Sequence, residues 1–153
     1  MALEVVEGIL QPSQPKSNRR GYGLFPELTI ISASGQARVF NKVATGEPVT
    51  SAVIAGGQGR YYFQRAGGAL GLIGVRRPDG TSHYGHYTNL APIVLVVGAL
   101  GVLAGVARFA FGIADLPLTP AVLGPLLLLL GAYLNSQKNA ARRAFETDGT
   151  SAA

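Results

Sequence analysis

The chain has 153 residues, no Cys or Trp, 21 Gly and a net charge of +5, and only 14% of its residues are charged. A soluble domain carries roughly a quarter of charged residues. These values exclude a disordered charged tail protein, a disulfide-stapled secreted domain and a Cys-based zinc module. The shortage of charge favours a small membrane protein.

Residues 1–89 are rich in Gly, β-branched and aromatic residues, in short apolar stretches separated by turn residues. This pattern is typical of β-strands and predicts a small barrel or sandwich of OB-like or SH3-like size. The segment from 11 to 23, which contains basic residues at 16–20, is expected to be an exposed loop. The predicted strands cover residues 3–10, 27–33, 36–43, 49–55, 59–65, 69–76 and 82–87.

A glycine-rich segment at 56–59 precedes a predicted strand with three consecutive aromatic residues. Specific phosphate-binding loops lead into a helix, so a tight connection between strands is favoured over a nucleotide site. Side chains alternate along a strand, which predicts Tyr61 and Phe63 in the core and Tyr62 outside. A single exposed Tyr is not a platform on which bases could stack, so nucleic-acid binding is not the favoured interpretation. The possible ligand or partner surface comprises Gly56, Gly57, Gly59, Arg60, Tyr62 and Arg65.

The two histidines lie three residues apart just before the apolar part of the chain. A metal site is not expected, because residues an odd number apart on a strand point to opposite faces and further ligands are missing from the neighbouring sequence. Amphipathic rings are instead typical of the headgroup region of a membrane. The residues predicted at this interface are His83, Tyr84, His86 and Tyr87.

Two long uncharged runs follow, at 90–107 and 116–137. Each is long enough for a helix that crosses the hydrocarbon core, and the preceding residues are too few to bury two such helices. We therefore predict a transmembrane hairpin over 90–137, with spans at about 90–113 and 117–136. The Pro-containing turn at 115–120 would join them, and Pro125 would bend the second helix.

Glycines recur along one face of each predicted span: Gly98, Gly101, Gly105 and Gly112 on the first, Gly124 and Gly131 on the second. Small residues allow helices to approach closely in lipid. Two interpretations remain open, namely packing of the hairpin on itself and a face for another subunit. Arg108, at the end of the first span, is expected to extend to the headgroups rather than to line an ion pathway.

Basic residues lie next to both open ends of the hairpin, which would be on the same side of the membrane. Arg76 and Arg77 precede the first span, and Lys138, Arg142 and Arg143 follow the second. By the positive-inside tendency, both termini are expected in the cytoplasm. The N-terminal residues show no basic region or long apolar core, so no cleavable signal peptide is expected. Residues 138–153 are predicted to form a polar cytoplasmic tail, frayed from about 147.

The eight acidic residues are scattered without a catalytic pairing, so neither enzymatic activity nor a cofactor is expected. The favoured hypothesis is a non-enzymatic accessory or scaffold subunit of an inner-membrane type. Its partners would be membrane lipid and other membrane subunits or further copies of itself. Two alternatives stay open: an effector or sensor that binds a cytoplasmic nucleotide-like anion, and a membrane-anchored nucleic-acid-binding module.

Overall fold

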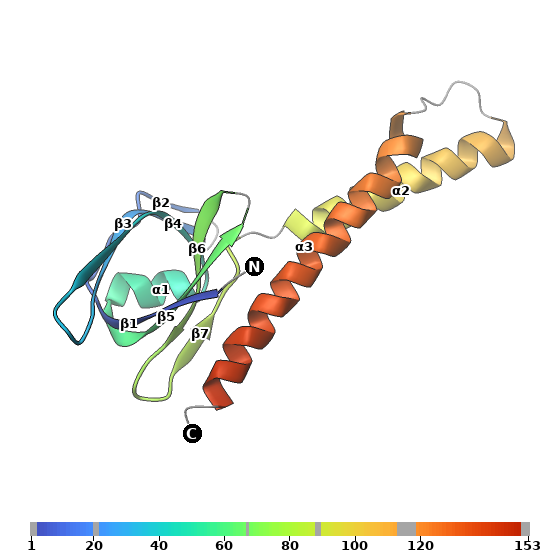
Figure 1. The fold of residues 1–153 in the computed structure, drawn as a ribbon. Coiled ribbons are helices and arrows are strands. Elements are labelled where there is room, and N and C mark those ends of the chain that lie inside the picture. Colours follow the sequence, from blue (N-terminus) through green and yellow to red (C-terminus); the bar gives the residue numbers. More distant parts are fainter. Residues whose placement is uncertain (1–2, 20–21, 67, 88–89, 113–118, 151–153) are drawn as a thin grey trace. The chain divides into compact units, whose positions relative to one another are not determined.

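The computed structural model describes residues 3–19, 22–66, 68–87, 90–112 and 119–150 (Figure 1). Contacts between residues divide the chain into two compact units. One comprises Met1–Thr88 and Ala141–Ala153, and the other comprises Asn89–Ala140. The C-terminal helix therefore contributes residues to both units.

The first unit contains a closed five-stranded β-barrel. Going round the barrel, the strands follow the order β1 (Leu3–Leu10), β5 (Gly57–Ala66), β6 (Ala69–Arg76), β4 (Ala37–Gly46) and β3 (Tyr22–Ile31). Pairing of β1 with β3 closes the ring, and β4 and β6 run parallel. Two short strands extend it, because β2 (Ser17–Arg19) pairs with β3 and β7 (Ser82–Tyr84) pairs with β6. The small β-barrel expected from the sequence is confirmed.

Most of the predicted strands occur, with different ends in several cases. Strands β1 and β6 have the predicted bounds. Strand β3 starts five residues earlier than predicted, because Tyr22 to Phe25 continue the ladder with β4. The expected loop at 11–23 accordingly contains β2 and the start of β3.

The predicted strand at 49–55 is wrong, because these residues form helix α1 (Val49–Ala55). The β-branched residues of this segment favour a strand, but its buried positions follow helical spacing. Val49, Thr50, Ala52 and Val53 all face the barrel interior from one side of the helix. Tertiary packing therefore overrides local propensity here.

The barrel core combines side chains from all five barrel strands and α1. The rings of Phe40 and Phe63 stack with their centroids 4.2 Å apart. A second cluster lies on the outer side of β5 and β6 and includes Tyr62 and Ile73. The fully buried large residues of the barrel core are Leu10, Phe25, Leu28, Ile30, Val43, Val49, Val53, Tyr61, Phe63 and Leu72.

The second unit contains α2 (Leu90–Phe111) and most of α3 (Thr119–Thr150). Among the described helices, only α2 is long and apolar enough to cross a membrane, with a mean hydropathy of 2.5. Of the two predicted spans, one therefore corresponds to a helix that could cross a membrane, and the predicted transmembrane hairpin is not confirmed. The apolar part of α3 begins at Thr119 and contains Pro125. Polar residues follow from Asn135, so the apolar part of this helix is short. Most of the predicted turn at 115–120 lies outside the described residues.

Candidate functional site

The C-terminal part of α3 packs on the outer surface of the barrel within the first unit. Phe145 is its main contact and is only 5% exposed. The ring meets Tyr62 edge to face, with centroids 4.8 Å apart, and lies 5.4 Å from the ring of Tyr84. Gly74 makes room for it, since a Cβ there would come within 2.5 Å of the Phe145 ring. The barrel surface is thus shaped to receive an aromatic side chain.

Arg76 of β6 binds the same residue through its guanidinium group. The guanidinium carbon lies 4.5 Å from the centre of the Phe145 ring, and Nη2 donates a 2.6 Å hydrogen bond to the Phe145 carbonyl oxygen. A cation over an aromatic face is attracted by the ring quadrupole. The Nε atom of Arg76 is buried and has no acceptor among the described residues. The site therefore holds an unused hydrogen-bond donor.

One helical turn after Phe145, Asp148 contacts the barrel through its carboxylate. Its carboxylate accepts a 2.5 Å hydrogen bond from the Tyr62 hydroxyl and lies 3.6 Å from Arg60. Arg60 also lies 3.5 Å from Glu7 of β1. Burial first, and then the Asp148 carboxylate, raises the pKa of Tyr62 to about 12. The phenol therefore stays protonated as a donor at neutral pH.

These contacts differ from the expectation of a polar tail after residue 137. Helix α3 continues to Thr150, and Ala141 and Phe145 are buried. The available signal was the spacing of Ala141, Phe145 and Asp148, which places them on one face of a helix. Gly74 within a strand gave a second signal, because a strand glycine often marks the close approach of another group, here the Phe145 ring.

Of the glycine-rich segment at 56–59, Gly56 lies between α1 and β5 and the other residues begin β5, so the segment joins a helix to a strand rather than two strands. Carbonyl oxygens of this segment accept hydrogen bonds. The carbonyl oxygen of Gly56 accepts a 3.0 Å hydrogen bond from Arg77, and that of Gly57 accepts one from the Tyr61 hydroxyl. A Cβ at Gly59 would lie 2.5 Å from the Arg76 carbonyl oxygen. These contacts suit a tight connection between elements. Of the other predicted surface residues, Arg60 and Tyr62 contact Asp148, and Arg65 is exposed.

Of the residues predicted at the membrane interface, the histidines and tyrosines at 83–87 belong to the barrel unit and Arg108 belongs to the second unit. Tyr87 is only 8% exposed, because its ring covers Gly71, and His86 stacks on it with centroids 5.3 Å apart. Tyr84 is half-buried beside Phe145, and His83 pairs with Val75 at the β7 edge. Packing on the barrel therefore occupies the two tyrosine rings that were expected to face headgroups. Arg108 lies in the last turn of α2.

In the second unit, five of the six predicted packing glycines lie at the contact between α2 and α3, four of them with no room for a Cβ. A Cβ at Gly98 would lie 2.8 Å from the Leu128 nitrogen, and one at Gly124 would lie 2.6 Å from the Val102 nitrogen. Gly105 meets Ala121, and Gly131 meets Leu95. Of the remaining two, Gly101 contributes backbone beside Gly124. Gly112 differs from the prediction, because it follows the last residue of α2 at a φ of +64° and has open space around it.

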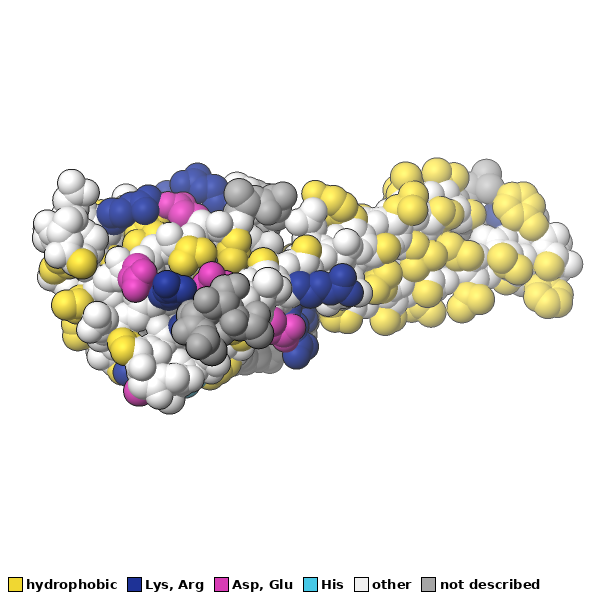
Figure 2. Space-filling view, turned by 60° about the horizontal axis from the view of Figure 1, so that its bottom comes forward, with side chains coloured by type: hydrophobic (Ala, Val, Ile, Leu, Met, Phe, Trp, Pro, Cys, Tyr) yellow, Lys and Arg dark blue, Asp and Glu magenta, His cyan; other side chains and the backbone are white. Residues whose placement is uncertain are grey.

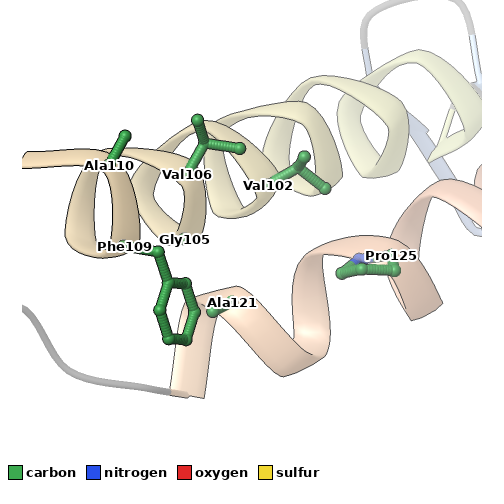
Figure 3. Close-up of a pocket in the computed structure, with 7 residues that line it drawn as sticks. All are labelled: Val102, Gly105, Val106, Phe109, Ala110, Ala121 and Pro125. Atoms are coloured by element: carbon green, nitrogen blue, oxygen red, sulfur yellow. The ribbon is translucent and has the colours of Figure 1, made fainter.

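An apolar groove of about 540 Å³ opens between the two helices near this contact (Figure 3). Its lining side chains are all apolar, and the ring of Phe109 extends over it toward Ala121. Pro125 also lines the groove and cannot donate to the carbonyl of Ala121 four residues before it. The lining residues are Val102, Gly105, Val106, Phe109, Ala110, Ala121 and Pro125.

Among the described residues, no group of three or more His, Cys, Asp or Glu side chains could hold a metal ion. The docked segment of α3 and the glycine contact of the hairpin are therefore the two built sites from which function can be argued. Comparison of the chain with models of protein families, with curated proteins and with solved structures found no match.

Proposed function

We propose that the protein is a non-enzymatic membrane-anchored accessory subunit, in which the helices hold the chain in the bilayer and the barrel provides a contact surface. One observation carries this proposal. Helix α2 has 22 residues and a mean hydropathy of 2.5, yet only 11% of its most apolar window is buried. A soluble protein rarely exposes such an apolar surface, whereas lipid accommodates it.

The packing of the hairpin supports a two-span anchor. Glycines bring the backbones of α2 and α3 into contact, and the outward positions carry large apolar side chains such as Leu100, Leu103 and Leu129. Figure 2 shows hydrophobic side chains over most of the visible surface of the hairpin. Lipid gives helices no hydrophobic drive to associate, so close backbone packing is the usual solution. In this proposal the glycines pack α2 against α3, and the outward leucines face lipid.

The proposed orientation has both termini in the cytoplasm. Lys138 and Arg143 follow the apolar part of α3, and Arg76 and Arg77 precede α2. Basic residues next to a span favour the cytoplasmic side. The polar residues of the barrel would then form a cytoplasmic contact surface for other subunits of a membrane complex.

A second candidate function rests on the connectivity of the barrel. In chain order its strands are β1, β3, β4, β5 and β6, with α1 between the third and fourth. This connectivity resembles that of the five-stranded Greek-key barrels of the OB type, several of which bind oligonucleotides. Membrane-anchored nucleic-acid binding predicts that the full chain binds single-stranded oligonucleotide with an affinity that falls steeply with salt. Absence of binding at low salt would remove this candidate.

Membrane extraction followed by purification tests the favoured proposal. The tagged chain should resist alkaline carbonate extraction and require detergent for release. Native mass determination in mild detergent should then show a stoichiometric larger partner. A chain released by carbonate would refute the anchor, and a chain purified only as copies of itself would refute the accessory role. Single cysteines placed at Ser82 and at Gly112 would report the sidedness of each end of α2.

A further inference from the structure

We propose that the outer surface of β5, β6 and β7 is a docking site for an amphipathic helix of a partner protein. We call this surface the helix-binding face and define it by Tyr62, Gly74, Arg76 and Tyr84. In the structure it holds residues 141–148 of α3, so a partner helix would compete with this segment. The inference rests on the proposed function, because it specifies where the barrel of the accessory subunit meets its partner.

The shape of the face selects an aromatic side chain from a helix. Tyr62 and Tyr84 contact the Phe145 ring, and Gly74 lies beneath it without a side chain. Arg76 completes the site with its guanidinium over the ring. Aromatic anchors in a preformed pocket commonly dominate the energetics of helix recognition.

The charge of the face selects acidic groups on the same helix. Arg60 interacts with Asp148, one turn after the aromatic residue. The buried Nε of Arg76 has no acceptor among the described residues, although Nη2 of the same group is bonded. A carboxylate can accept from two donors of one guanidinium. A partner helix with one carboxylate beside its aromatic residue and another one turn later would therefore satisfy a donor that α3 leaves unused.

The segment now in place is held by few side chains. In residues 141–148 only Ala141 and Phe145 are buried, and Asp148 is half-buried. Arg142 pairs with Glu146 on the same helix, and because both side chains are exposed, water screens their electrostatic interactions with Tyr84 of the barrel. A contact made by one aromatic ring, one small buried side chain, one carbonyl oxygen and one carboxylate is small enough to exchange with a competing helix.

A labelled peptide with the sequence of residues 139–150 tests the site in trans, using the full chain in detergent micelles. The Phe145→Ala chain should bind this peptide about tenfold more tightly than the wild-type chain does, since its own segment no longer fills the site. Adding Gly74→Leu, which places a side chain where the ring lies, should abolish that binding. Val39→Leu, at an exposed apolar position elsewhere on the barrel, is the matched control and should leave it unchanged.

Asp148→Ala is the second variant, in case Phe145→Ala fails to fold. It weakens the attachment of the segment to the barrel but keeps the buried Phe145 ring. It should bind the peptide more tightly than wild type but less tightly than Phe145→Ala. Equal binding by all chains, or equal binding of a peptide with the Phe replaced by Ala, would overturn the site. If the full chain forms dimers and the peptide dissociates them, a second copy of the chain occupies the site. That result would overturn the assignment to a partner protein. Resistance to carbonate extraction is measured separately, so failure of the docking site is distinguishable from failure of the anchor.

Discussion

The hydroxyl of Tyr62 in β5 donates a 2.5 Å hydrogen bond to the carboxylate of Asp148 in α3, across 86 residues of sequence. This bond joins the end of the last helix to a barrel whose strands were complete by residue 76. Arg60 lies 3.6 Å from the same carboxylate and compensates its charge. The C-terminal residues of α3 are therefore a structural part of the first unit.

The raised pKa of Tyr62 predicts a loss of stability at high pH. Burial and Asp148 raise this pKa from 10.0 to about 12, so the unfolded chain loses the proton at a lower pH than the folded chain. The stabilisation is complete below about pH 10 and disappears as the pH rises through about 12. Denaturation midpoints of the full chain in detergent, measured at increasing pH, should show this decline.

Tyr62→Phe is the matched control for this prediction. Tyr61, Tyr84 and Tyr87 also have raised pKa values, chiefly through burial, and they contribute equally in both proteins. The variant should therefore lose less stability than wild type over the alkaline range. Asp148→Asn should lower the pKa of Tyr62, because it removes the negative charge that helps to raise it. The loss of stability attributed to Tyr62 should then be complete at a lower pH than in wild type. Identical pH profiles for wild type and Tyr62→Phe would refute the prediction.

Arg77→Ala is predicted to destabilise the barrel through α1. The guanidinium Nη2 donates to the carbonyl oxygens of Ala52 and Gly56, at 3.4 and 3.0 Å, at the C-terminal end of that helix. Removing a charged donor leaves these acceptors unsatisfied, at a cost of about 1–3 kcal/mol. Chemical denaturation should show this loss. Arg65→Ala is the control, since Arg65 is exposed and makes no hydrogen bond or ion pair recorded within the described residues, and it should change stability by less than about 0.5 kcal/mol.

The success and failure of the sequence-based expectations have identifiable causes. The bounds of β1 and β6 could be predicted because each is a short apolar stretch that ends at turn residues. Residues 49–55 could not, because Val49 and Val53 favour strands locally and only the barrel interior imposes the helical spacing. Helix period and strand period compete closely in so short a segment.

The contact between the end of α3 and the barrel could not be predicted from the sequence either, for a different reason. Residues 138–150 are mostly polar, and the helical spacing of Ala141, Phe145 and Asp148 indicates one shared face without indicating what that face contacts. The site depends on long-range partners, Tyr62 and Gly74, that composition cannot connect to it. The hairpin contact was accessible, because glycines at Gly98 and Gly105 on one helix repeat every seven residues. What the sequence left open was the choice between packing on itself and packing on another subunit.

Arg38→Ala is predicted to change little despite a short ion pair. Its Nη2 lies 2.5 Å from a Glu4 oxygen, but the two side chains are 51% and 41% exposed. Water competes for exposed pairs, which contribute about 0–1 kcal/mol. The guanidinium carbon also lies 5.3 Å from the Phe40 ring centre, a contact of similarly small value when exposed. A loss of about 1 kcal/mol or less is expected in denaturation, and a loss comparable to that of Arg77→Ala would contradict this ranking.

The contact between α2 and α3 predicts a disulfide that reports on hairpin packing. The chain has no Cys, so two engineered cysteines are its only thiols. A Cβ at Gly105 would lie 2.8 Å from the Cβ of Ala121, slightly closer than the roughly 3.5–4.5 Å of a disulfide. Gly105→Cys with Ala121→Cys should therefore oxidise within one molecule after a small separation of the helices. Leu103→Cys with Leu129→Cys is the control pair, since these side chains are 63% and 70% exposed, and it should form little intramolecular disulfide.

Gly124→Leu in the same double-cysteine chain tests whether glycine packing holds the helices together. A side chain at Gly124 would meet the Val102 nitrogen at 2.6 Å, and the backbone of α2 can yield only by moving away. The yield of the intramolecular disulfide should then fall well below that of the parent pair in membranes, as measured by gel mobility with and without reductant. Leu126→Ala, at an outward position of α3, should leave the yield unchanged because it removes no contact between the helices. An unchanged yield in Gly124→Leu would show that the helices associate without close backbone contact, contrary to the packing expected in lipid.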